Sequence, residues 1–167
     1  MSARPPAPAQ VVSLLAGRGE TVSVAESLTA GLIGAALTTP PGASAAFVGG
    51  VLSYATELKH RLLGVPAELL EREGAVHPDV AAAMAEGVRL LTGSTYGLAA
   101  TGVAGPDPQD GKAPGTVHLA VSGPDGRVWH RDPRLAGTRE RIRESTVNEA
   151  VDLLRGVLEA NVGEHSG

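Results

Sequence analysis

The chain has 167 residues and a formal net charge of −4; 43% of its residues are apolar, yet only 2% are aromatic. This length suits one domain whose core is filled mainly by alanine, valine and leucine. The negative charge and the scarcity of aromatic rings argue against a nucleic-acid partner, and the absence of cysteine excludes disulfides and thiolate chemistry.

Neither secretion nor membrane insertion is indicated by the sequence. Residues 1–8 are rich in proline and lack the apolar core of a signal peptide. No stretch approaches the roughly 18 consecutive apolar residues of a membrane-spanning helix. We therefore expect a cytoplasmic protein without a membrane partner, and the absence of cysteine fits that reducing compartment.

Predicted helices and strands alternate along the chain. We expect a disordered or extended Pro-rich tail over residues 1–8, a single domain over 9–161 and a second tail over 162–167. The expected elements, in chain order, are a helix at 9–18, a strand at 21–25, a helix at 28–37, a strand at 47–54, helices at 56–63, 68–73 and 79–91, strands at 96–100, 115–121 and 127–131, and a helix at 138–161. The helix at 28–37 is apolar nearly all round, which predicts that it is buried. Gly49-Gly50 predicts a bulge or a close backbone approach.

This order of elements predicts an α/β fold, a three-layer α/β/α sandwich with a mixed, mostly parallel sheet of about five strands. Pro124-Asp125-Gly126 is a turn typical of a hairpin, so the last two strands should be antiparallel. Two turns rich in hydroxyl residues and glycine, at 25–31 and 100–106, directly follow apolar strands. Because such strands end at one edge of the sheet, we expect a single anion or oxyanion site there.

Two residues could supply acid–base and nucleophilic chemistry. Ser27 would lie between a strand and a helix, where the positive end of the helix could stabilise an oxyanion; alternatively, Ser27 only caps that helix. Lys59, five residues beyond Tyr54, could have a lowered pKa and act as a base for a serine; alternatively, it is a solvated lysine.

Arginines could bind a phosphate. Arg139 and Arg143 are four residues apart and share a helix face near its N-terminus, although Glu140 and Glu144 make a salt-bridged surface an equal explanation. The five histidines form no spaced pair typical of a helical metal site, so we expect no metal. From the residues alone, the chain is an anion-binding α/β domain that could be hydrolytic.

Four blocks of sequence together resemble the C-terminal domain of the CinA family, the competence/damage-inducible proteins, from about residue 12 to residue 158. The blocks are Ala25-Glu26-Ser27-Leu28-Thr29-Ala30-Gly31; Phe47-Val48-Gly49-Gly50-Val51-Leu52-Ser53-Tyr54 with Lys59; Gly74-Ala75-Val76 followed by Ala82-Ala83-Met84-Ala85; and Thr101-Gly102-Val103-Ala104-Gly105-Pro106 followed by Pro114-Gly115-Thr116-Val117. The order and spacing of all four agree with that family.

The resemblance implies an amidohydrolase that converts nicotinamide mononucleotide to nicotinate mononucleotide and ammonia, without metal or cofactor, in a homo-oligomer. It implies that Ser27 is the nucleophile and that Lys59 is the general base. It further implies that four side chains form hydrogen bonds in the site: Tyr54, Ser44, Thr29 and Thr101. The backbone amides around Gly102 and Gly105 would hold the oxyanion or the phosphate. Arg139 or Arg143 would bind the phosphate.

Some positions depart from the family pattern. Leu28, Ala30, His77 and Thr138 replace a cysteine, a glycine, a serine and an aspartate, and Asp107 and Asp110 lie where the family has a glycine run. Two other interpretations therefore stay open: a nucleotide- or phosphate-binding module that has lost catalysis, and an assembly partner whose alanine-rich helices pack between subunits. Turnover, ligand-induced stabilisation without turnover, or neither would separate the three.

Overall fold

The computed structural model describes residues 2–161, which fold around one mixed β-sheet. The elements are α1 (Ala7–Arg18), β1 (Val22–Glu26), α2 (Leu32–Thr38), the short 3-10 helix η1 (Ala43–Ala45), β2 (Phe47–Leu52), α3 (Thr56–Leu63), α4 (Ala67–Glu73), α5 (Pro78–Thr92), β3 (Tyr96–Gly102), β4 (Val117–Ser122), the 3-10 turn η2 (Pro124–Gly126), β5 (Val128–Arg131) and α6 (Arg139–Ala160). No helix within residues 2–161 is both long and apolar enough to cross a membrane.

The five strands stand in the order β2-β1-β3-β4-β5. Strand β1 is parallel to both of its neighbours, β2 and β3, whereas β4 is antiparallel to both β3 and β5. The carboxyl ends of β1, β2 and β3 therefore meet at one edge of the sheet, and β2 and β5 are its two outermost strands. This arrangement confirms the predicted α/β class, the mixed sheet and the antiparallel final pair.

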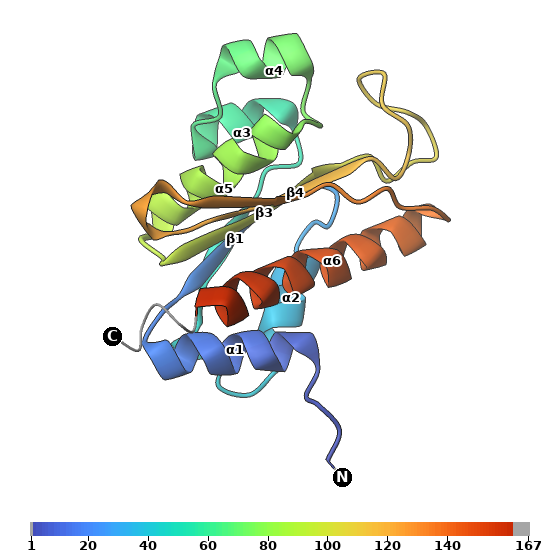
Figure 1. Ribbon diagram of the computed structural model, residues 1–167. Coiled ribbons are helices and arrows are strands. Elements are labelled where there is room, and N and C mark those ends of the chain that lie inside the picture. The colour runs from blue at the N-terminus through green and yellow to red at the C-terminus, as the bar shows by residue number, and fades with distance from the viewer. Residues whose placement is uncertain (1, 162–167) are drawn as a thin grey trace.

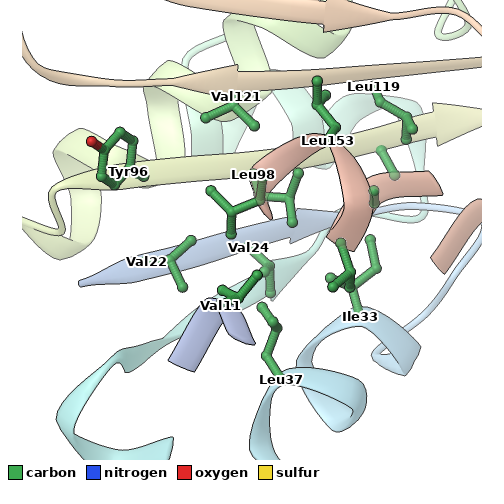
Figure 2. Close-up of a cluster of buried hydrophobic side chains, with 14 of the residues drawn as sticks. Val11, Val22, Val24, Ile33, Leu37, Tyr96, Leu98, Leu119, Val121 and Leu153 are labelled. Carbon is green, nitrogen blue, oxygen red and sulfur yellow. The ribbon is translucent and has the colours of Figure 1, made fainter. Parts of the chain in front are cut away.

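Helices cover both faces of the sheet, which gives the three predicted layers (Figure 1). Helices α1, α2 and α6 lie on one face, and α5, with α3 and α4 packed outside it, covers the other. The larger core is almost wholly aliphatic: Figure 2 shows Val24 and Leu98 of the sheet against Val11, Ile33 and Leu37 of the helices. Burial of these branched side chains supplies most of the driving force for folding.

Glycine allows the backbone layers to approach closely at two points. A Cβ on Gly97 of β3 would lie 2.0 Å from the carbonyl oxygen of Ala85 in α5. A Cβ on Gly50 of β2 would lie 2.5 Å from the carbonyl oxygen of Val24, and the register of β2 shifts by one residue just before Gly49. The bulge and the close approach predicted at Gly49-Gly50 are therefore both present.

All predicted element boundaries but one agree with the structure within two residues, and the exception is the start of α2. Helix α1 begins at Ala7, because Pro8 is compatible with a first helical turn, so residues 7 and 8 do not belong to a tail. Helix α2 begins at Leu32 and not at residue 28, since Ala30 and Gly31 are left-handed, with φ of 45° and 101°. It is also buried on one side only, through Ile33 and Leu37. The predicted tail at 162–167 lies outside the described residues.

Candidate active site

A cavity of about 570 Å³ opens at the carboxyl edge of the sheet. It lies where the turns after β1 and β3 face the segment that follows β2. Its lining residues are Ser27, Leu28, Tyr54, Ala55, Thr56, Gly102, Val103, Ala104, Gly105, Pro106, Asp107, Pro108, Gln109 and Arg139. The two hydroxyl-rich and glycine-rich turns thus line one cavity, at the edge of the sheet where the sequence predicts a site.

Ser27 and Lys59 are in direct contact in this cavity. The Nζ atom of Lys59 lies 3.0 Å from Oγ of Ser27 and donates a 2.6 Å hydrogen bond to the carbonyl oxygen of Ser53. Lys59 is fully buried because it occupies the sheet-facing side of α3, one turn before the buried Leu63. The alternative of a solvated lysine is therefore wrong.

Burial lowers the pKa of Lys59 from 10.5 to about 8, because the charged ammonium loses its hydration. Among residues 2–161, no carboxylate forms an ion pair with Lys59 that would hold it protonated. A substantial fraction of this amine is therefore neutral near pH 8. In that form it can accept the proton of the Ser27 hydroxyl, while the carbonyl of Ser53 fixes the direction of its N–H bonds.

Glu26 is a site residue that sequence reasoning missed. Its carboxylate is almost fully buried and accepts hydrogen bonds from the backbone N–H groups of Gly31, Ile33 and Gly34, at 3.1, 2.9 and 3.0 Å. Glu26 thus occupies the positive end of α2, and the Ser27 side chain does not cap that helix. The available signal was an acidic residue within the turn that leads into a helix.

The turn after β3 presents backbone groups to the cavity. Gly105 is left-handed, with φ of 86°, and its carbonyl accepts a 2.6 Å hydrogen bond from Nη1 of Arg139. Nη2 of Arg139 donates in turn to the hydroxyl of Tyr54, at 3.3 Å. Within the described part of the chain, no acceptor bonds the amide N–H groups of Ala104 and Gly105. These two donors can therefore serve a ligand.

Several predicted site residues lie outside the cavity wall. Thr101 is buried and its hydroxyl donates to the carbonyl of Ala75, at 2.7 Å, so it anchors the neighbouring turn. Nε of Arg143 donates to the carbonyl of Leu28, at 2.8 Å, so of the two arginines only Arg139 reaches the cavity. Thr29 is fully buried, and its hydroxyl has no hydrogen-bond partner among residues 2–161.

Ser44 is not brought to the cavity within one chain. It is exposed on η1, which precedes the amino end of β2, whereas Tyr54 follows the carboxyl end of that strand. The six residues of β2 span about 20 Å at the usual rise per residue. The sequence already separates Ser44 from Tyr54, because Ser44 precedes the strand predicted at 47–54 and Tyr54 is its last residue.

The positions that depart from the family pattern keep local structural roles. Leu28 is buried and forms part of the cavity wall beside Ser27. His77 caps α5 by accepting from the N–H of Asp79, and Thr138 caps α6 by accepting from the N–H of Arg141. His77 and Thr138 thus each cap the start of a helix.

A hairpin at residues 107–114 forms one wall of the cavity. Asp110 turns away from the cavity and accepts from the N–H of Ala75, at 3.2 Å, whereas Asp107 remains in the wall. Lys112, which the sequence did not single out, donates to the carbonyls of Glu73 and Val76. The hairpin is therefore held on the turn between α4 and α5.

Within residues 2–161, no group of three metal-ligating side chains is assembled.

Comparison with known proteins places this geometry in a family. The CinA C-terminal domain profile matches residues 6–158. The chain is 56% identical over 148 residues to a CinA-like protein of Frankia casuarinae, and 50% identical over 151 residues to a putative competence-damage inducible protein of Desulforamulus reducens. These alignments cover 89% and 90% of this chain but 34% and 36% of the relatives, so the chain spans about a third of the curated relatives' length.

Solved structures match over nearly their whole length. The competence/damage inducible protein CihA from Agrobacterium tumefaciens is 35% identical with a TM-score of 0.84, covering 95% of this chain and 99% of its own. A CinA superfamily protein from Klebsiella pneumoniae is 30% identical with a TM-score of 0.88, covering 92% and 96%. The chain belongs to the CinA C-terminal domain family.

Proposed function

We propose that this protein is an amide hydrolase that converts nicotinamide mononucleotide to nicotinate mononucleotide and ammonia. The observation that carries the proposal is the 3.0 Å contact between Ser27 and a buried Lys59 whose pKa is lowered to about 8, inside a cavity of about 570 Å³. A cavity of this size suits a mononucleotide. Membership of the CinA family and the amide chemistry open to a serine–lysine pair support it.

Acylation begins when neutral Lys59 takes the hydroxyl proton of Ser27. The Ser27 oxygen bonds to the carbonyl carbon of the carboxamide, and the carbonyl oxygen becomes a tetrahedral oxyanion. The N–H groups of Ala104 and Gly105 are the donors that can stabilise this charge. The C–N bond then breaks, and the proton on Lys59 passes to the leaving nitrogen, so that ammonia departs from an acyl-Ser27 ester.

In deacylation, water is the nucleophile and Ser27 is the leaving group. Lys59 removes a proton from a water molecule, whose oxygen attacks the ester carbon and regenerates the oxyanion. The C–O bond to Ser27 breaks and Ser27 takes up the proton held by Lys59, which leaves a carboxylic acid. This acid releases its remaining proton to solvent, and the product leaves as a carboxylate. Lys59 thus acts as base and then as acid in each half of the reaction.

Arg139 is the residue proposed to neutralise the substrate phosphate. Its guanidinium is fixed at the cavity wall by Gly105 and Tyr54, which leaves its remaining N–H donors for phosphate oxygens. Thr101 and Arg143 then act through position, by fixing the turns that carry Ala75 and Leu28. We expect Thr101→Val to lower turnover by less than about tenfold, because no reacting atom loses a hydrogen bond.

The experiment is ammonia release from nicotinamide mononucleotide, with product carboxylate measured in parallel. Ser27→Ala and Lys59→Met should each lower kcat/KM by about 1000-fold or more, since each removes a group that acts directly in bond formation. Ser13→Ala, at an exposed serine of α1, is the matched control and should behave as wild type.

Two results would contradict the proposal. One is a folded wild-type protein that releases no ammonia; if the mononucleotide still raised its melting temperature, the binding-module alternative would replace the hydrolase. The other is a Ser27→Ala variant with unchanged turnover, which would remove the assigned nucleophile.

A further inference from the structure

Ser53 carries a buried hydroxyl that neither half of the proposed reaction uses. The residue is fully buried, and among residues 2–161 no group forms a hydrogen bond with its Oγ atom. Buried hydroxyls are nearly always hydrogen-bonded, because the loss of water is otherwise uncompensated. The backbone carbonyl of the same residue already binds Lys59, so the hydroxyl is a candidate for a second contact with that side chain.

The alternation of side chains along the strands places the Ser53 hydroxyl on the same side of the sheet as Ser27. Ala25 of β1 and Val51 of β2 are paired in register, and both contact the smaller core cluster, which packs α5 against the sheet. The N–H of Ser53 donates to the carbonyl of Glu26, at 2.9 Å, so the pairing of the two strands continues to Ser53. Because side chains alternate between the two faces of a strand, Ser27 and Ser53, each two residues further on, point to the face that α5 covers.

Lys59 reaches this face from α3, which packs on α5. Its Nζ atom lies 2.6 Å from the carbonyl oxygen of Ser53. Only four bonds separate that oxygen from Oγ of the same residue, so rotation about the Cα–Cβ bond brings Oγ within reach of the amine. A lysine ammonium has three N–H donors, and within the described part of the chain two acceptors bind it, Oγ of Ser27 and the Ser53 carbonyl. One N–H donor and one hydroxyl, both buried, are therefore left over side by side.

We infer that Ser53 is a positioning residue whose hydroxyl accepts an N–H of Lys59 and thereby turns the lone pair of the amine toward Ser27. A neutral amine has two N–H bonds and one lone pair. If the Ser53 carbonyl alone takes an N–H, either the second N–H or the lone pair can face Ser27, and only the lone pair can accept the serine proton. When both oxygens of Ser53 are engaged, the lone pair is the one position left for Ser27.

The same contact serves the charged form of Lys59. Once the amine has taken the proton of Ser27, each of its three N–H groups has an acceptor, one on Ser27 and two on Ser53. The surroundings offer little else, because the residues that α3, α4, α5 and the loop between α3 and α4 contribute to the smaller core cluster are all apolar: Leu63, Val65, Leu69, Val80, Ala81, Met84, Ala85 and Val88.

Other titratable groups near the cavity are engaged elsewhere or do not bond to the amine. The Glu26 carboxylate binds the start of α2, on the opposite face of the sheet. Among the described residues, none of the titratable side chains of the cavity wall, Tyr54, Asp107 and Arg139, forms a hydrogen bond with Lys59. The orienting role of Ser53 rests on the proposed function, whereas the hydrogen bond itself does not.

The hydrogen bond is tested without turnover, by an NMR titration of the lysine side chains. The chain has only two lysines, Lys59 and Lys112, so protein labelled with ¹³C-lysine gives two Cε signals, which Lys59→Met assigns. Ser53→Ala should shift the titration midpoint of Lys59 to lower pH by about 0.5–1 pH unit, because the ammonium loses an acceptor. The signal of Lys112 is the internal reference and should not differ between the variants.

Ser23→Ala is the matched control. Ser23 is a fully buried serine on the same face of β1, where its Oγ donates to the carbonyl of Val88 in α5, at 3.2 Å. It lies four residues before Ser27, about 13 Å along the strand, so its removal should leave the Lys59 midpoint unchanged. Ser53→Thr keeps a hydroxyl and should titrate as wild type does. Equal midpoints in wild type and Ser53→Ala would overturn the inference, and so would a Ser53→Thr midpoint equal to that of Ser53→Ala.

Kinetics test the orienting role. Above the Lys59 midpoints of both proteins, Ser53→Ala should lower kcat for nicotinamide mononucleotide about tenfold with little change in KM, because Ser53 is not part of the cavity wall. Ser53→Thr should recover most of the lost rate, and Ser23→Ala should behave as wild type. A residue that only supports the fold would change stability without changing kcat or the midpoint.

The two readouts separate this inference from the proposed function. If the midpoint shifts but wild type releases no ammonia, the hydrolase proposal fails and the hydrogen bond between Ser53 and Lys59 stands. If wild type is active and Ser53→Ala keeps the full kcat, the orienting role is overturned while the hydrolase proposal stands.

Discussion

The two turns at the carboxyl edge of the sheet have similar compositions but opposite uses. The turn after β1 satisfies the start of α2 with the Glu26 carboxylate and presents a side chain, Ser27, to the cavity. The turn after β3 buries its hydroxyl residue, Thr101, and leaves the backbone N–H groups of Ala104 and Gly105 without an acceptor among the described residues. Hydroxyls and glycines therefore do not specify a role by themselves; the role depends on which of the turn's own groups are already bonded.

We expect the largest effect on stability from Glu26→Gln, which tests whether the Glu26 carboxylate holds the turn after β1. Glu26→Gln replaces one acceptor oxygen by an N–H₂ group facing backbone donors, so buried N–H groups lose their partner. We expect a loss of about 2–4 kcal/mol in the free energy of unfolding, measured by urea titration. Glu140→Gln, at an exposed position in the first turn of α6, should change it by less than about 0.5 kcal/mol. Equal effects would mean that the carboxylate does not hold the turn.

The second prediction concerns Lys59, the partner of that turn's serine. Its pKa of about 8 lies below 10.5, so the folded state is penalised for carrying the charge at all pH values below 8. The shift corresponds to about 3 kcal/mol, which the fold regains as the pH rises from 8 to 10.5. Lys59→Met should therefore be more stable than wild type at pH 6 by about 1–3 kcal/mol, and this advantage should vanish near pH 10.5.

The same loss of the Lys59 proton should also control catalysis. Wild-type kcat/KM should rise with pH and level off above about 8, as Lys59 becomes neutral. Urea titrations at pH 6 and 10 and a pH–rate profile measure the two effects. A Lys59→Met advantage that does not change with pH would contradict the desolvated amine.

Two glycines test how far the turn after β3 depends on its backbone. Gly105→Ala and Gly111→Ala both place alanine at a positive φ, 86° and 75°, but only the Cβ at residue 105 meets another group, Pro114 at 2.9 Å. Gly111→Ala should cost about 1 kcal/mol, and Gly105→Ala a further 1–2 kcal/mol. Only Gly105→Ala should also lower ammonia release, because it displaces backbone donors. If both variants lost activity equally, the turn's amides would not be the relevant groups.

The smallest expected effect is a gain. Ala30 is left-handed, with φ of 45°, in the turn after β1. Ala30→Gly relieves that strain but increases the freedom of the unfolded chain, so we expect a net stabilisation of about 0.5 kcal/mol. Ala35→Gly, an exposed helical position in α2, should instead destabilise by about 1 kcal/mol. Thermal melts of the two variants should shift in opposite directions, and a shared sign would refute the strain.

The sequence predicted the sheet and its layers well because these depend on local, repeated signals. Apolar runs bounded by glycine and proline located all five strands, and their boundaries agree within two residues. The start of α2 was mispredicted for a related reason: apolar periodicity continues through the turn at residues 28–31, but the left-handed Ala30 and Gly31 interrupt the helix. Periodicity reports which face is apolar and does not report φ.

The candidate site was predicted in part. Ser27, Lys59, Tyr54, Gly102, Gly105 and Arg139 were all singled out from the sequence, and the structure brings Ser27 and Lys59 within 3.0 Å across 32 residues of chain. Arg143 and Thr101 have side chains that could equally bind a ligand, yet their hydrogen bonds go to the backbone of Leu28 and Ala75. Lys112 was missed because its partners are backbone carbonyls, which leave no signature in the sequence. For Glu26 the one available signal was its place in the turn that leads into a helix.

The sequence by itself thus predicted the α/β class and the strand boundaries, because hydrophobic periodicity is a local property. The roles of Ser27 and Lys59 were predicted only through the family resemblance, because their residue chemistry alone left a helix cap and a solvated lysine open. Only the tertiary structure decided which groups meet: Lys59 enters the interior because α3 turns it toward the sheet, and burial then lowers its pKa to about 8. The same holds for Glu26, whose carboxylate bonds to α2 only because the turn brings that helix back over β1. Desolvation and hydrogen-bond pairing act over distances of a few ångströms in space, and the chain order does not encode those distances.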